Sequence, residues 1–164
     1  MKRAGICLLL LIRLNMFFLA LFSFSYAQSI SSIKDSLINE IDYIRSNPSE
    51  YGQQIHVNLD EFEPKKELRR TLFMDLIAQE RASECAKMRS LSHRNRDRKD
   101  YRGKEYTESL HRSPHWEFVI QELISDYGVP SRSHRKHIFT NHSRIGIGVS
   151  KKDGVYYVAI ITKP

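Results

Sequence analysis

Residues 144–162 read RIGIGVSKKDGVYYVAIIT, and this stretch predicts an antiparallel β-hairpin. In its first half, bulky residues at 145, 147 and 149 alternate with small residues at 146, 148 and 150. The nearly bare face suits the close approach of another element. Lys151 to Gly154 supplies a turn in which Gly154 occupies a position that favours positive φ. The second strand, Val155 to Thr162, is mostly apolar, so we expect it to be buried on both faces.

Residues 33–44 have the periodicity of an amphipathic helix. Ser32 with Asp35 predicts a capping-box start, and Asn47-Pro48 predicts a stop. Pro48 can itself open a short helix through Tyr51 and Ile55. An acidic-then-basic linker, residues 60–70, follows. The apolar positions of the first helix are Ile33, Leu37, Ile41 and Ile44.

Three more helices are predicted between the linker and the hairpin. One runs from about Met74 to Leu91 and ends at Ser92-His93, and a second covers Trp116 to Tyr127. A short third helix, capped by Ser131 or Ser133, extends through Phe139. The predicted helices come first in the chain and the antiparallel strand pair comes last. This order indicates an α+β fold, with helices packed on a small sheet. The expected buried faces are Met74, Ile77, Ala78, Ala82, Cys85 and Met88 in one helix and Val119, Ile120, Leu123, Ile124 and Tyr127 in the next.

The first 27 residues have the pattern of a secretory signal peptide, with a basic start, an apolar run and small residues before Gln28. The alternative is a membrane anchor, but Arg13 and Asn15 interrupt the apolar run, and Leu14 to Phe24 is too short to span. We expect cleavage after Ala27 and one exported domain, residues 28–164, without a transmembrane anchor. Its location would be periplasmic or extracellular.

Charge and cysteine content narrow the function classes. Loss of the three basic residues of the signal lowers the formal charge from +7 to +4, a mild excess that demands no acidic partner. The polar run from Arg94 to Arg102 lacks interleaved aromatics, which favours a solvated loop over contact with nucleic acid or anionic lipid. Cys85 is then the one remaining cysteine, so no intramolecular disulfide forms. Its place on an apolar helix stripe predicts a buried thiol rather than a reactive one.

The chain lacks the standard catalytic motifs, including the nucleophile elbow, the His-Glu-x-x-His zinc helix and the phosphate loop. What stands out is a set of titratable residues next to predicted element ends: His93, Glu108, Asp126 and His134. Each alone is more often a surface or capping residue than a ligand. His134 and His137 can share a helix face, which is a weak indication of metal binding. His111 and His115 have Pro114 between them and need not share one.

The order of these segments resembles the CAP superfamily, also called the SCP-like or sperm-coating-protein-like domain, in its short bacterial form. The resemblance covers about Ile33 to Thr162. The stretches that carry it are Leu37–Pro48, Ala86–His93, Gly128–Phe139 and Arg144–Val149. The most specific feature is a His-Arg pair that opens a short helix and is followed by a glycine-alternating strand.

The resemblance implies an α-β-α sandwich with a cleft lined by two histidines and two carboxylates. By motif, His93 and His134 match the two histidines, Glu108 matches the first carboxylate, and Asp126 stands where a glutamate is usual. Several members bind a divalent metal through the two histidines; others bind sterols, fatty acids or proteins, and protease activity has been proposed for some. The chain departs from the family pattern at Thr107, Ser109 and Ser133 and lacks the eukaryotic disulfides.

Three functions compete. In the first, the domain is a binding module: His93 and His134 hold zinc or another divalent metal, and the ligand is an extracellular lipid, glycan or protein. In the second, it is a metal-dependent hydrolase with Glu108 or Asp126 as general base. In the third, the polar residues only satisfy one another. Because no organised nucleophile is visible, we favour the binding module and leave enzymatic activity open. We expect a monomer that does not bind nucleic acid.

Overall fold

A computed structural model describes residues 29–93 and 106–164. The predicted signal peptide, its cleavage site and the Arg94–Arg102 loop lie outside these residues. The elements are α2 (Ile30–Ser46), α3 (Pro48–Gln54), β1 (Arg69–Arg70), α4 (Leu72–Met88), β2 (Thr107–Ser113), a 3-10 turn (Trp116–Phe118), α5 (Val119–Ser125), α6 (Ser133–Ile138), β3 (Arg144–Lys152) and β4 (Val155–Lys163). No helix among the described residues is long and apolar enough to cross a membrane.

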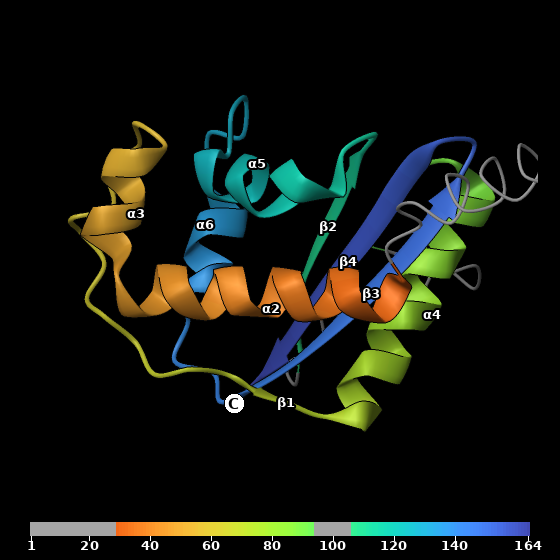
Figure 1. The fold of residues 1–164 in the computed structure, drawn as a ribbon, viewed down its shortest axis with the longest axis horizontal. Helices are drawn as coiled ribbons and strands as arrows, with labels where there is room; N and C mark the ends of the chain where they lie inside the picture. The colour runs from red at the N-terminus through yellow and green to blue at the C-terminus, as the bar shows by residue number, and fades with distance from the viewer. Residues whose placement is uncertain (1–28, 94–105) are drawn as a thin grey trace, which may run out of the picture.

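The fold is the predicted three-layer α-β-α sandwich (Figure 1). The sheet has the order β1-β3-β4-β2, so the C-terminal hairpin forms its centre. The predicted small antiparallel sheet is correct for β2, β3 and β4, but β1 joins β3 in parallel and makes the sheet mixed. Helix α4 covers one face, whereas α2, α5 and α6 lie on the other.

The hairpin has the predicted turn and the predicted two-sided burial. Asp153 and Gly154 both have positive φ, at 51° and 80°, as a tight two-residue hairpin turn requires. Alternate residues of β4 enter different cores: Val158 and Ile160 pack beneath α2 and α5, whereas Ala159 and Ile161 pack beneath α4. Among the described residues, both cores consist of residues between Ile33 and Ile161.

The bare face of β3 is closely approached by another element, as predicted, and that element is α4. A Cβ at Gly146 would lie 2.1 Å from the carbonyl carbon of Met74, and one at Gly148 would lie 1.9 Å from the carbonyl oxygen of Ala78. No side chain fits in these spaces. Glycine at both positions therefore sets the distance between helix and sheet.

Three helices begin or end at residues other than those predicted, because their caps come from residues that apolar periodicity does not identify. Ser29, rather than Ser32, caps α2 by accepting a hydrogen bond from the Ser32 amide. Helix α4 ends at Met88, which is exposed, because Arg89 takes the left-handed conformation of a C-terminal cap. Neither Ser131 nor Ser133 caps α6; its first residue follows Arg132, whose side chain makes no capping bond.

The predicted helix from Trp116 to Tyr127 divides into the 3-10 turn and the shorter α5. Val119, Ile120, Leu123 and Ile124 are buried as expected. Tyr127, however, is 99% exposed. The reason is that Asp126 adopts a left-handed conformation, with φ of 51°, which ends the helix and turns the next side chain out of the apolar stripe.

Candidate functional site

Two histidine–carboxylate pairs are formed by the four residues that the sequence singled out. The Nδ1 of His93 lies 2.8 Å from a carboxylate oxygen of Glu108, and the Nδ1 of His134 lies 2.7 Å from one of Asp126. Both carboxylates are fully buried, whereas both imidazoles are partly exposed. Because an ionised carboxylate only accepts hydrogen bonds, Nδ1 is the donor in each pair, and a neutral imidazole in this tautomer has its lone pair on Nε2.

Glu108 is held by an arginine that sequence reasoning missed. Arg81 of α4 has a fully buried side chain and donates through Nε to the second Glu108 oxygen at 2.7 Å. It also bonds Glu84 and the carbonyl oxygen of Ser92. Burial lowers the pKa of Arg81, but the hydrogen bond and charge of Glu108 outweigh it, so that the pKa lies above its usual value. The one available signal was the place of Arg81 on the buried stripe of α4.

Asp126 joins α5 to α6. One of its oxygens accepts the Nδ1 hydrogen bond of His134, and the other accepts the backbone N–H of Arg135 at 3.1 Å, which caps the start of α6. The side chain of Arg135 in turn donates hydrogen bonds to the carbonyl oxygens of Ile124 and Ser125 at the end of α5. The left-handed conformation of Asp126 suits a short polar side chain. Reciprocal capping therefore fixes the position of His134.

A third histidine, His137 of α6, lies buried between β2 and β4. Its Nδ1 is 2.6 Å from the hydroxyl of Ser109, and its Nε2 is 2.6 Å from that of Thr162. Burial is the main cause that lowers its pKa to about 3, and the charges of His142, His134, Arg45 and His93 add to it. His137 is therefore neutral.

The sequence did not predict β2, the strand that places Glu108. Glu108 points toward α4, whereas its neighbour Ser109 points toward α6 on the other face of the sheet. Leu110 is the one apolar residue of the strand, so β2 shows no apolar alternation. Its burial depends on hydrogen-bond partners from α4 and α6, which only the tertiary structure supplies.

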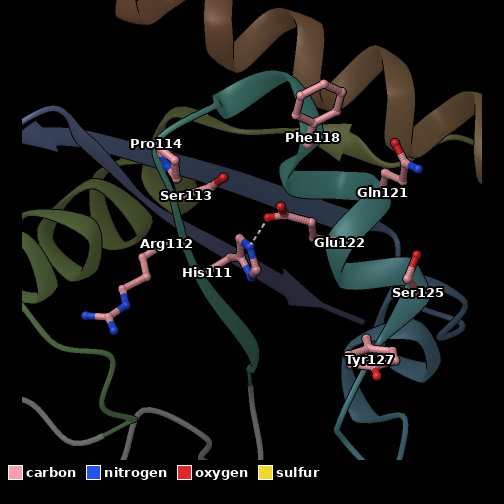
Figure 2. Close-up of a pocket in the computed structure, with 9 residues that line it drawn as sticks. All are labelled: His111, Arg112, Ser113, Pro114, Phe118, Gln121, Glu122, Ser125 and Tyr127. Carbon is pink, nitrogen blue, oxygen red and sulfur yellow. Dashed lines mark hydrogen bonds and ion pairs between the residues drawn. The ribbon is translucent and has the colours of Figure 1, made fainter.

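A groove of about 600 Å³ lies between β2 and α5 and extends to Ser125 and Tyr127 (Figure 2). His111 of β2 and Glu122 of α5 face each other across it, with the Nε2 of His111 2.5 Å from a carboxylate oxygen. Most other lining side chains are polar, but Phe118 and Tyr127 present exposed rings. In the sequence, His111 stood out only through its spacing to His115, and nothing linked it to Glu122.

The metal ligands predicted from the sequence, His93 and His134, stay a prediction. Within residues 29–93 and 106–164, no three His, Cys, Asp or Glu side chains converge as a ready ligand set for an ion. The donors do fit a site of another kind, because an imidazole whose Nδ1 is bound to a carboxylate is oriented to bind a metal through Nε2. Cys85 is buried, as expected, and burial raises the pKa of its thiol.

No family model matches the chain, and no curated protein matches it in sequence. Solved structures do match its fold. An outer surface protein from Borrelia burgdorferi superposes with a TM-score of 0.59 at 15% identity, over 82% of this chain and 94% of that one. The venom allergen-like protein 4 of Schistosoma mansoni, a CAP protein, gives 0.55 at 14% identity, over 85% and 90%. The CAP-type fold expected from the sequence is thus confirmed.

Proposed function

We propose that this CAP-type domain is an extracytoplasmic binding module in which His93 and His134 hold one divalent metal ion beside the ligand groove. The observation that carries the proposal is the pairing of both imidazoles, through Nδ1, with fully buried carboxylates. Similarity in fold to an outer surface protein supports the location outside the cytoplasm. So does the predicted signal peptide.

The chemistry of the four side chains suits a two-imidazole site. Nε2 of His93 and Nε2 of His134 would be the protein ligands, and Glu108 and Asp126 would orient the rings as outer partners. Two imidazoles alone leave positions for water and for oxygen atoms of a ligand. The ion would serve as a Lewis-acid attachment point for such a ligand.

The same contacts favour binding over hydrolysis. One oxygen of Glu108 binds His93 and the other binds Arg81, while one oxygen of Asp126 binds His134 and the other the Arg135 amide. A general base needs a lone pair directed at the proton it removes. Carboxylates engaged at both oxygens are better suited to orienting their histidines.

The neighbouring groove supports a polar ligand. Ser125 and Tyr127, on either side of Asp126, both line it, so a ligand in the groove would extend toward His134. Its lining combines hydrogen-bonding groups with the exposed rings of Phe118 and Tyr127. This combination suits a glycan or a peptide better than a lipid tail, which needs an apolar enclosure.

Calorimetric titration of zinc, and then of calcium, into metal-stripped protein (residues 28–164) tests the proposal. We expect one-site binding that is lost in His93→Ala/His134→Ala and kept in the matched control His111→Ala/His115→Ala. Asp126→Asn retains a side chain that tolerates the left-handed conformation but loses the carboxylate, and should weaken binding about 10- to 100-fold.

Two results would contradict this function. If neither ion binds, or if the His93→Ala/His134→Ala protein binds as the parent does, the two-imidazole site is wrong. If the metal-loaded protein turns over peptides, esters or glycans, and the same double variant abolishes turnover, the domain is a hydrolase rather than a binding module.

A further inference from the structure

The first two turns of α4 carry large apolar side chains on their outer surface. Leu72 is 77% exposed, Phe73 63% and Leu76 61%, although Met74 and Ala78 of the same helix are fully buried against the sheet. We name Leu72, Phe73 and Leu76 the apolar patch. Single exposed apolar residues are ordinary, but three neighbours on successive turns form a continuous surface of the kind that marks an interaction site.

A row of basic side chains lies at the same end of the molecule. Arg69 of β1 is in register with Arg144 of β3, which is in register with Lys163 of β4. Residues opposite one another in a sheet project from the same face. We name these three residues the basic row. Figure 1 shows β1, the start of α4 and the C-terminus together at the lower end of the molecule.

The basic row and the apolar patch adjoin. Arg69 precedes Leu72 by three residues, and α4 contacts β3 at Gly146, two residues beyond Arg144. Because β3 side chains alternate, Arg144 and Gly146 share the face that α4 covers. The nearby carboxylates of Asp35 and Asp75 are both engaged by Arg70. Arg69, Arg144 and Lys163 therefore add positive charge beside the apolar patch, while the exposed carboxylate of Glu80 lies one helical turn beyond Leu76 on α4.

We propose that this end of the domain docks on an anionic membrane surface. The apolar patch would enter the boundary between head groups and acyl chains, and the basic row would contact lipid phosphates and anionic head groups. Apolar side chains flanked by Lys and Arg favour this location, because burial and electrostatic attraction then act together. The inference does not rest on the proposed metal site, which is built from His93, β2 and the junction of α5 and α6 rather than from the apolar patch or the basic row.

Charge makes a second copy of the chain a poorer occupant. A two-fold symmetric contact places the same surface on both subunits. Two basic rows would then lie close together, where like charges repel. Three side chains also fall well short of the roughly 800 Å² per partner that a standard stable interface buries.

Vesicle co-sedimentation tests the proposal with residues 28–164, which contain both cores and lack the apolar leader. The probes are phosphatidylcholine vesicles with and without phosphatidylglycerol. We expect binding to the phosphatidylglycerol vesicles that weakens as salt is raised. Phe73→Ser/Leu76→Ser and Arg69→Gln/Arg144→Gln should each weaken it about tenfold or more, since each basic residue near such a surface contributes to attachment.

Matched controls remove apolar area or charge elsewhere: Phe118→Ser in the groove, and Arg112→Gln/Lys151→Gln at the other end of the strands. We expect both to bind as the parent does. All substituted side chains are exposed, and circular dichroism with thermal unfolding verifies that each variant is folded.

Four results would overturn the proposal. They are no binding to either vesicle, equal binding with and without phosphatidylglycerol, equal losses in the controls, or a sedimentation-equilibrium dimer that Phe73→Ser/Leu76→Ser abolishes. The last would assign the patch to self-association. None of these results bears on metal binding, because calorimetry with zinc reports on His93 and His134 separately.

Discussion

Acidification from pH 7 to pH 5 should destabilise the domain through His137. This imidazole is buried between the hydroxyls of Ser109 and Thr162, and its pKa in the folded protein is about 3 against 6.5 for the free group. In that pH range the unfolded chain binds a proton that the folded chain does not. Stability is therefore fully present above pH 6.5 and falls as the pH decreases toward 3.

The magnitude follows from the two pKa values. Each pH unit below 6.5 costs about 1.4 kcal/mol until the folded-state pKa is reached. Between pH 7 and pH 5 the free energy of unfolding should consequently drop by about 2 kcal/mol from His137 alone. That is a large part of the stability of a small domain, which is typically about 5–15 kcal/mol.

Urea denaturation at pH 5, 6 and 7, with parent and His137→Gln side by side, measures this contribution. Glutamine can hydrogen-bond both hydroxyls but does not titrate. The variant should be less stable than the parent at pH 7, and the difference should shrink by about 2 kcal/mol at pH 5. Other titrating groups cancel in the comparison. Parallel pH dependence of the two proteins would refute the assignment of a neutral, buried His137.

Two further substitutions test the framework that holds the site. Arg81→Met leaves the buried Glu108 carboxylate without its arginine partner and should lower the free energy of unfolding by about 3–5 kcal/mol. The double variant Arg81→Met/Glu108→Gln should recover part of this loss, because it also removes the buried charge. A loss below about 1 kcal/mol in the single variant would contradict the buried pair. Gly148→Ala, whose Cβ would lie 1.9 Å from the Ala78 carbonyl oxygen, should cost about 3 kcal/mol in the same urea assay, against about 1 kcal/mol for the exposed-turn control Gly154→Ala. Equal costs would mean that α4 can move away from β3.

Elements with a local apolar pattern were predictable. The hairpin, α2 and the inner part of α5 follow from the spacing of their apolar residues, and the turn follows from Asp153-Gly154. The resemblance also named the four residues that form the two histidine–carboxylate pairs, without saying which pairs with which. It did not indicate what holds them, because Arg81 and Arg135 are separated in sequence from the groups they bind and belong to no short motif.

Sequence alone therefore determined the α+β class, the C-terminal hairpin and the glycine face that another element approaches, because these depend on side-chain periodicity and on the size of side chains. Tertiary structure decided which polar residues are buried and which groups form hydrogen bonds with them. Strand β2 is the clearest case, since Glu108 and Ser109 are stable there only because Arg81 and His137 approach from opposite faces of the sheet. Burial of a polar group depends on a partner, and in this chain the partners come from distant segments.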